Sequence, residues 1–251
     1  MEREEQIRQL VEKYEKEYTE FMGIEKFPKY KLELFEIKMD QVDLAGFGVL
    51  AQAIYNPKTD VHTLRICVNL ELMKYVVFHE FTHILDAEMY AKRDSLRYAY
   101  LSGYTEYHAS QVELMVLIGA ENIHSMEFTF SLNSKIETFP FGKGIEEYLC
   151  SKHQFVVDMM SRPDFPVNIE TLKTTLGALY NYFGLRSICK MYAKNYVEQV
   201  DNTAIVNILP LELFSVMNGL MEGWFDKAKV EMSFGPYSNA IMPMIKEYKL
   251  L

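Results

Sequence analysis

The chain has 251 residues, 49% of them hydrophobic, and a formal net charge of −9. This length suits one large domain or two small ones, and the apolar fraction is enough for a buried core. The acidic balance argues against a nucleic-acid-binding protein, because neutralising phosphates requires clustered Lys and Arg. We attribute the negative net charge to a role in keeping the protein soluble rather than to the binding of a cationic substrate.

The three cysteines, Cys67, Cys150 and Cys189, are widely spaced and form no CxxC pair. We expect all three to be buried thiols, which suits a reducing cytosol. No apolar segment follows the charged N-terminus, as a signal peptide would require, and no apolar run approaches the roughly 18 residues of a membrane span. The sequence therefore predicts a cytoplasmic protein with no nucleic-acid or membrane partner, and it leaves the oligomeric state open.

Helical and strand patterns alternate in the first part of the chain. Apolar residues recur at helical spacing over 4–22, and Gly23 ends that helix. Period-two alternation predicts a strand over Lys31–Lys38, and Gly46–Tyr55 and His62–Val68 are also β-compatible. These strands are too close in sequence for βαβ crossovers, so the sheet should be at least partly antiparallel.

A helix is predicted over residues 72–90, which contain no Pro or Gly, with Asn69 as its N-cap. It carries the sequence HEFTH at positions 79–83. Residues four apart lie on one face of a helix, so His79 and His83 can bind the same metal ion. Glu80 lies about 100° further round, within reach of a metal-bound water. This HExxH arrangement is typical of zinc sites in which the glutamate is the general base.

The alternative is that these are ordinary residues of a buried helix. Two imidazoles and a carboxylate in an apolar helix would be unfavourable without a compensating ion. We therefore favour the metal site.

After residue 90 the sequence predicts helices almost throughout, apart from a mixed stretch over 121–143. Asn168 is expected to cap a helix that runs to about Gln199, with a break considered at Gly184, and Pro210 should impose a helix boundary. The other expected helices are Tyr104–Gly119, 145–160 and Thr203–Lys229, and Gly235–Leu251, with Pro236 and Pro243, should be irregular before a short helix. The predicted fold is α+β and predominantly helical, with the metal site in residues 1–120 and an all-helical region over 121–251.

A catalytic zinc takes three protein ligands and keeps one position open. The extended motif HExxHxxGxxH would place Gly at 86 and His at 89, but this chain has Asp86 and Met89, which excludes the metzincin type. The remaining candidates for the third ligand are acidic residues or histidines downstream: Asp86, Glu88, Asp94, Glu106, His108 and Glu113.

Glu106 is our choice for the third ligand. The HEFTH helix should end near 93–95, the chain should turn at Gly103, and a second helix should begin near Thr105. A glutamate in its first turn would face back across an antiparallel helix pair, and Ala109 would let the two helices approach closely. The alternative is that Glu106 is a first-turn carboxylate favoured by the helix dipole.

Several other roles stay open. His108 and Glu113 compete with Glu106 as ligands, and His108 could instead contact the substrate or a developing oxyanion. Tyr104 and Tyr107 are equal candidates for the oxyanion by proximity, with core packing as the default for both. Asp86 lies on the face of both histidines, where it could accept a hydrogen bond from an imidazole Nδ1, bind the metal or form a surface salt bridge.

With these residues in place, the first half resembles a zincin metallopeptidase of the gluzincin branch. Within that branch it is similar to the ImmA/IrrE-like metallopeptidases, bacterial and phage-borne proteins that cleave transcriptional repressors. The resemblance covers about residues 1–120 and rests on three segments: the strand Leu64–Asn69 leading into the helix, residues 79–85 of the helix, and Glu106-Tyr107-His108-Ala109, which is like the downstream Glu-x-x-Ala signature. His108 stands where that family usually has an acidic residue.

The resemblance implies a zincin-like fold in which His79, His83 and Glu106 bind Zn²⁺ and Glu80 is the base. It implies a zinc-dependent peptidase whose peptide or protein substrate lies along an edge strand at Gly46–Tyr55. Two other functions stay open. One is a regulatory or binding protein on a zincin scaffold, with a structural metal or vestigial activity. The other is a metal-dependent hydrolase of a non-peptide amide.

Overall fold

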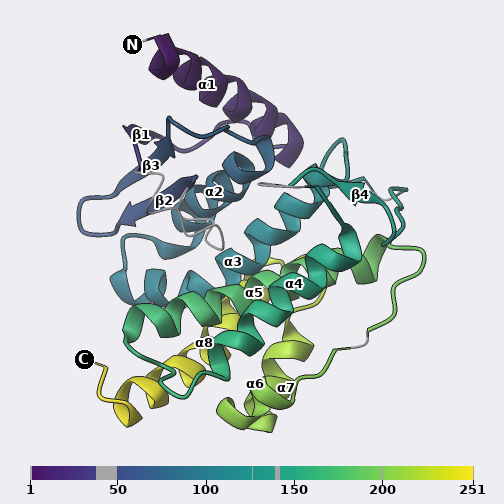
Figure 1. The fold of residues 1–251 in the computed structure, drawn as a ribbon. Helices are drawn as coiled ribbons and strands as arrows, with labels where there is room; N and C mark the ends of the chain where they lie inside the picture. Colours follow the sequence, from purple (N-terminus) through teal and green to yellow (C-terminus); the bar gives the residue numbers. More distant parts are fainter. Residues whose placement is uncertain (1, 38–49, 126, 139–141, 199, 251) are drawn as a thin grey trace. The chain divides into compact units, whose positions relative to one another are not determined.

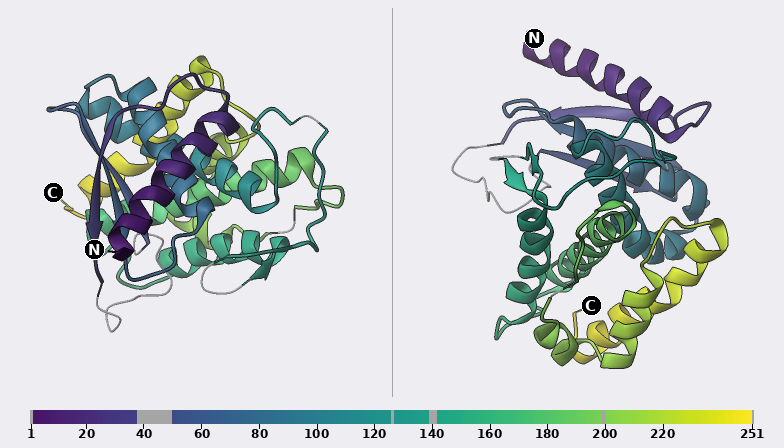
Figure 2. Two further views of the ribbon diagram at one scale, coloured as in Figure 1. Left: turned by 90° about the horizontal axis from the view of Figure 1, so that it is seen from above. Right: turned by 90° about the vertical axis from the view of Figure 1, so that its right-hand side faces the viewer.

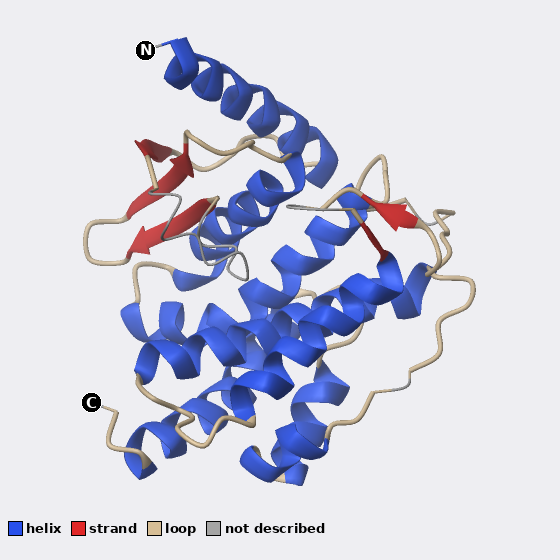
Figure 3. Cartoon of the chain, in the orientation of Figure 1, coloured by secondary structure: helices blue, strands red, loops and turns tan. Residues whose placement is uncertain are grey.

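The computed structural model describes residues 2–37, 50–125, 127–138, 142–198 and 200–250 (Figure 1). This described part is predominantly helical, with a small three-stranded sheet and a short pair of strands (Figure 3), so the predicted α+β class is confirmed. None of its helices combines the length and the apolarity needed to cross a bilayer.

Contacts divide the chain into two compact units, which we describe separately. The first unit comprises Met1–Tyr98, Val112–Phe128 and Glu137–Gly142, and the second comprises Ala99–Gln111, Thr129–Ile136 and Lys143–Leu251. The predicted boundary near residue 120 divides the chain by role rather than by contacts, and it stays a prediction.

The first unit carries the sheet and the HEFTH helix. The helix predicted over 4–22 is present, and so are the described parts of the three predicted strands. The first strand is shorter than expected. Residues 38 and 46–49 of the predicted strands lie outside the described residues. Its elements are α1 (Glu2–Met22), β1 (Tyr30–Phe35), β2 (Ala51–Asn56), β3 (Val61–Cys67), α2 (Lys74–Asp86) and a π-helical turn η3 (Ala87–Ala91).

The three-stranded sheet is mixed, with the order β1-β3-β2. β1 runs parallel to β3, and β2 runs antiparallel to β3, which confirms the prediction of a partly antiparallel sheet. Because β3 lies in the centre, β2 is an edge strand of the described sheet, with one side of its backbone turned away from β3.

α1 fixes the orientation of α2 through aromatic packing. The fully buried ring of Tyr18 lies 5.2 Å from the ring of Phe78 and 5.5 Å from that of Phe81, and its hydroxyl donates to Oγ1 of Thr82 at 3.0 Å. These α2 residues are buried against α1. The rotation of α2 about its axis, and with it the direction of the HExxH histidines, therefore depends on this packing.

Asn69 does not cap α2 as predicted. The N-cap position is Met73, which makes no side-chain cap bond. Asn69 instead donates from Nδ2 to the Ile37 carbonyl at 2.7 Å and accepts from the Ile37 amide at 3.2 Å, so it joins the segments that follow β1 and β3. The cysteine prediction is wrong at one position, since Cys67 is buried but Cys150 is exposed.

The second unit is mainly a group of packed helices. Its elements are β4 (Lys135–Ile136), β5 (Lys143–Gly144), α4 (Ile145–Met160), α5 (Ile169–Tyr192), α6 (Thr203–Ile208), α7 (Leu211–Leu220) and α8 (Lys227–Glu247). α4 lies beside α5, and α7 packs on α8 (Figure 2). The expectation of helices alone is wrong, because β4 and β5 form an antiparallel pair.

The C-terminal region differs most from the prediction. Residues 221–226 are not helical, whereas α8 continues through both Pro236 and Pro243. The two prolines are seven residues apart, so they lie on nearly the same face of the helix. Each leaves one carbonyl four residues earlier without its helical partner. These carbonyls belong to the exposed residues Met232 and Asn239, where water can hydrate them.

α5 is capped as predicted, with Oδ1 of Asn168 accepting from the Thr171 amide at 2.8 Å, but it ends at Tyr192 and is not broken at Gly184. A Cβ at Gly184 would overlap the backbone carbonyl of Tyr107, which lies on α3 (Ser95–Leu117). The glycine therefore serves close packing of two helices rather than chain reversal.

Replacing Gly184 with alanine should destabilise the protein by about 1–3 kcal/mol, because the new methyl group forces α5 away from α3. The matched control is Gly235→Ala within α8, where an added Cβ meets nothing within 4 Å. That change should be neutral or stabilise by up to about 1 kcal/mol through helix propensity. Urea unfolding of both variants measures the difference, and equal stabilities would contradict the packing role.

Candidate metal centre

α2 presents the two histidines of the motif one helical turn apart. The ring centroids of His79 and His83 are separated by 4.8 Å at an interplanar angle of 75°. His79 is buried and His83 is half-buried. Both ring nitrogens of each imidazole can accept a proton or bind a metal, so the role of each nitrogen depends on its partner.

The partner of His79 is Glu113. The Nδ1–H of His79 donates to Oε2 of Glu113 at 2.8 Å, and the Glu113 side chain is fully buried. A carboxylate can only accept, so this bond fixes the proton on Nδ1 and leaves the lone pair on Nε2. That is the tautomer a metal ligand needs, and the bond also ties α2 to α3.

α3 begins earlier than predicted. Oδ1 of Asp94 accepts from the amides of Leu96 and Arg97, which caps a helix starting at Ser95 rather than near Thr105. The expected turn at Gly103 is wrong, because an added Cβ there would lie 2.7 Å from the rings of Tyr180 and Tyr237, so this glycine serves close packing. Glu106 therefore lies well inside α3, which removes the helix-dipole explanation for it.

Glu106 lies seven residues before Glu113 on the same helix. Seven residues bring it to within about 20° of Glu113 around α3 and about 10 Å along the axis. The ligand atoms of His79, His83 and Glu106 all lie within 4.8 Å of one another, and among the described residues this is the group that can hold a metal ion. The predicted ligands are thus brought together in space.

The donor set fits zinc. Two imidazole nitrogens and one carboxylate oxygen are ligands that Zn²⁺ accepts at about 2.0–2.2 Å, which would bring the three atoms about 3.4 Å apart. The group is at most about 1.4 Å wider than this, a difference that small side-chain rotations can close. Three ligands would also leave a fourth position open, as a catalytic site requires.

Two neighbours shape the surroundings of Glu106. A Cβ added to Gly177 on α5 would lie 3.5 Å from Cγ and 3.7 Å from Cδ of Glu106, so the glycine leaves space beside this carboxylate. Tyr237 on α8 has its pKa raised to about 12, chiefly by burial; the charge of Glu106 also raises it, and a hydrogen bond with Ser102 lowers it. Glu106 thus has open space on the side of α5 and a buried tyrosine on α8 within range of its charge.

Glu80 faces the sheet rather than open solvent. Its side chain is buried, and Oε2 accepts a hydrogen bond from the amide of Ala53 on β2 at 2.6 Å. Glu80 is not a member of the ligand group, as the HExxH interpretation expects. Its role as general base stays a prediction.

His108 and Tyr104 are not brought to the ligand group. Each is two residues from Glu106 and therefore lies about 160° away from it around α3. Their rings stack on each other at 5.5 Å, Tyr104 stacks on Phe225 at 5.3 Å, and His108 meets the edge of Trp224 at 6.3 Å. None of these ring contacts involves the ligand group, and both catalytic roles stay predictions.

The remaining carboxylates have other settings. Asp86 is fully buried, so the surface salt bridge considered for it is wrong, and its charge contributes, after burial, to raising the pKa of Tyr18. The bond to an imidazole Nδ1 expected of Asp86 is made, for His79, by Glu113. Glu88 is exposed and bonds Nε2 of the buried His62 at 3.1 Å.

The sequence suggests Glu113 only as a metal ligand and not as a hydrogen-bond partner of His79. That contact depends on how α2 and α3 pair, which the sequence does not show. One sequence signal could have pointed to it: the seven-residue spacing from Glu106, which puts both carboxylates on one helix face.

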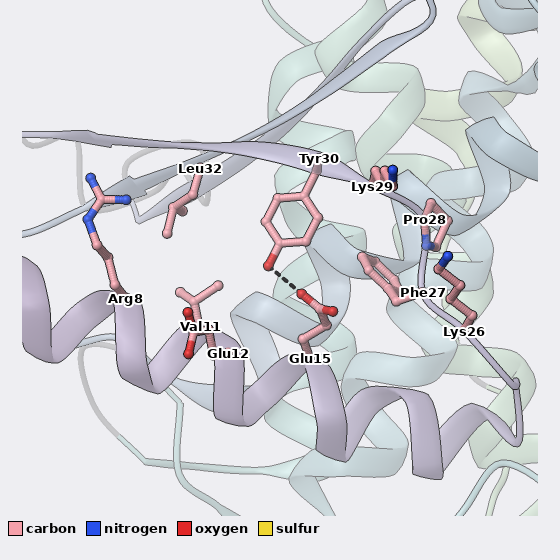
Figure 4. Close-up of a pocket in the computed structure, with 10 residues that line it drawn as sticks. All are labelled: Arg8, Val11, Glu12, Glu15, Lys26, Phe27, Pro28, Lys29, Tyr30 and Leu32. Atoms are coloured by element: carbon pink, nitrogen blue, oxygen red, sulfur yellow. Dashed lines mark hydrogen bonds between the residues drawn. The ribbon is translucent and has the colours of Figure 1, made fainter.

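An open groove lies elsewhere in the first unit, between α1 and β1 (Figure 4). Its volume is about 510 Å³, and inside it the Tyr30 hydroxyl donates to Glu15 at 2.8 Å. Charged side chains of both signs and a few apolar ones line it: Arg8, Val11, Glu12, Glu15, Lys26, Phe27, Pro28, Lys29, Tyr30 and Leu32. It contains no residue of the ligand group.

Comparison with protein-family models, with curated proteins and with solved structures finds no match to this chain. The interpretation of the site therefore rests on its residues and their geometry.

Replacing Glu113 with alanine should weaken zinc binding by about 10–100-fold, because His79 loses the partner that fixes its tautomer and ring orientation. Glu113→Gln should lose less, since its amide oxygen still accepts from Nδ1–H. Titration with zinc against a chromogenic chelator measures both, with Glu20→Gln, an exposed carboxylate on α1, as the control. Unchanged affinity in Glu113→Ala would show that this bond does not support the site.

The space beside Glu106 gives a second test. Gly177→Ala should bind zinc like the wild type, because its Cβ would make ordinary contact at 3.5 Å. Gly177→Leu should displace the Glu106 carboxylate and reduce zinc affinity at least tenfold, while His79 and His83 still bind weakly. Circular dichroism confirms that both variants fold, and equal affinities in folded proteins would argue against Glu106 as a ligand.

Proposed function

We propose that this protein is a zinc-dependent peptidase of the gluzincin type, similar to the ImmA/IrrE-like metallopeptidases. The observation that carries the proposal is the convergence of His79, His83 and Glu106, from two helices, within 4.8 Å. The HExxH sequence alone requires only that two histidines share a helix face. The arrival of a third ligand from α3 is independent support, because sequence separation alone does not impose it.

In this proposal His79, His83 and Glu106 hold the metal, and Glu113 orients His79. Zinc, when bound, supplies a Lewis acid that polarises a carbonyl and lowers the pKa of water toward about 7. Glu80 takes the proton from the attacking water and passes it to the leaving amine. The peptide or protein substrate lies extended along the edge strand β2, whose backbone can pair with it.

One observation favours the alternative of a regulatory or binding protein with a structural metal. The carboxylate of Glu80 accepts a hydrogen bond from the Ala53 amide at 2.6 Å, so in this conformation it joins α2 to β2 as a structural residue would. Metal-edge X-ray spectroscopy of the zinc-loaded protein separates the two functions. Three protein ligands would support the peptidase, and a closed set of four would support the structural site.

Glu80→Gln tests the peptidase directly. The variant should keep stoichiometric zinc, because Glu80 is not a ligand, and should lose about 10²–10⁴-fold in cleavage rate, because the amide cannot accept the proton. The assay follows zinc-dependent cleavage of reduced, carboxymethylated α-lactalbumin, a permanently unfolded chain, with Glu20→Gln as control. Zinc retained with undiminished cleavage would refute Glu80 as the base.

A further inference from the structure

Along the edge strand β2, the backbone amides alternate between facing β3 and facing away from it. In the antiparallel pairing with β3, Ala53 lies opposite Leu64, and Tyr55 lies opposite His62. The amides of both β2 residues bond side chains instead of β3: Ala53 donates to Oε2 of Glu80 at 2.6 Å, and Tyr55 donates to the Tyr98 hydroxyl at 3.4 Å. Residues 53 and 55 therefore turn their amides to the side of β2 that faces away from β3.

The bond to Glu80 is the stronger of the two. At 2.6 Å it is short for an N–H donor, and its acceptor carries a charge, which makes such bonds roughly twice as strong as neutral ones. The bond to Tyr98 is long for this class. Glu80 is also only 7% exposed, so water competes little for its carboxylate.

An outward amide of an edge strand is the group that an incoming strand would use. A peptide that pairs with β2 across its free edge needs the Ala53 N–H as a donor for one of its carbonyls. One N–H cannot make a short, linear bond to Glu80 and to a peptide carbonyl at the same time. Peptide pairing and the Glu80 bond are therefore mutually exclusive at this position.

We propose that Glu80 is a latch on the edge strand, which rests on the proposed peptidase function. Without substrate, the Glu80 carboxylate occupies the Ala53 N–H. An extended peptide that pairs with β2 takes this N–H and frees the Glu80 carboxylate from the strand. Release requires a backbone carbonyl in strand conformation, so the latch selects unfolded or extended chain segments, whatever their side chains.

The latch itself is tested first by amide hydrogen exchange, measured by NMR on the metal-free protein. The Ala53 amide should exchange at least tenfold faster in Glu80→Ala than in the wild type. The Ile54 amide faces β3 and is the internal control, which should not change. Equal exchange of Ala53 in both proteins would overturn the proposal, whether or not the protein cleaves peptides.

The competition is tested by binding without turnover. Fluorescein-labelled, reduced and carboxymethylated α-lactalbumin is titrated with metal-free protein, and anisotropy gives the dissociation constant. Glu80→Ala should bind about tenfold more tightly than the wild type, because the Ala53 N–H is free. Ala53→Pro should bind more weakly, since proline has no N–H; it removes no bond to β3, so an edge strand can tolerate it.

The double variant decides the mechanism. In the Ala53→Pro background, Glu80→Ala should no longer tighten binding, because both changes act through one amide. Tightening that persists there, or no binding by Glu80→Ala at all, would overturn the latch. If Ala53→Pro fails to fold, the exchange result and the single Glu80→Ala comparison still decide it. Failure of the peptidase itself would appear separately, as absent zinc-dependent cleavage by the wild type.

Discussion

The candidate site depends on the hydrogen bond between His79 and Glu113. It is buried, it joins α2 to α3, and it determines which nitrogen of His79 carries the proton. A fully buried carboxylate is unfavourable without a strong partner, so this bond resists any sliding or rotation of one helix on the other. Because α3 is continuous, fixing Glu113 also fixes Glu106 two turns away, and the carboxylate of Glu106 lies within 4.8 Å of the ligand atoms of the histidines.

Local sequence signals predicted the parts of this arrangement that depend on one segment. The HEFTH helix follows from an apolar pattern without Gly or Pro, the cap at Asn168 from its side chain, and the helix 145–160 from its periodicity. The choice of Glu106 also agrees with the ligand group, although its reasoning placed the residue in a first helical turn. Glu106 lies well inside α3 rather than in a first turn, and it still meets the two histidines.

Several of the errors share one physical cause: the structural role of a glycine or a proline depends on its neighbours. Gly103 and Gly184 look like breaks in sequence, yet both sit inside helices where another chain segment approaches too closely for a side chain. Pro236 and Pro243 look like helix ends, yet the carbonyls they leave unbonded belong to exposed residues. Only tertiary packing distinguishes a glycine or proline that breaks a helix from one that lies within it, and this packing cannot be inferred from a single sequence.

Charge gives a further reason to place a cation at this site. Glu80, Asp86 and Glu113 are all buried on α2 and α3, and Glu106 is half-buried beside them. The Ala53 amide donates to Glu80, and the imidazole of His79 donates to Glu113. Several carboxylates in a largely apolar setting are strongly unfavourable unless they are protonated or face a cation. A divalent ion held by His79, His83 and Glu106 would provide a cation at Glu106 and at the imidazole that Glu113 contacts, so the buried charge and the ligand geometry point to the same chemistry.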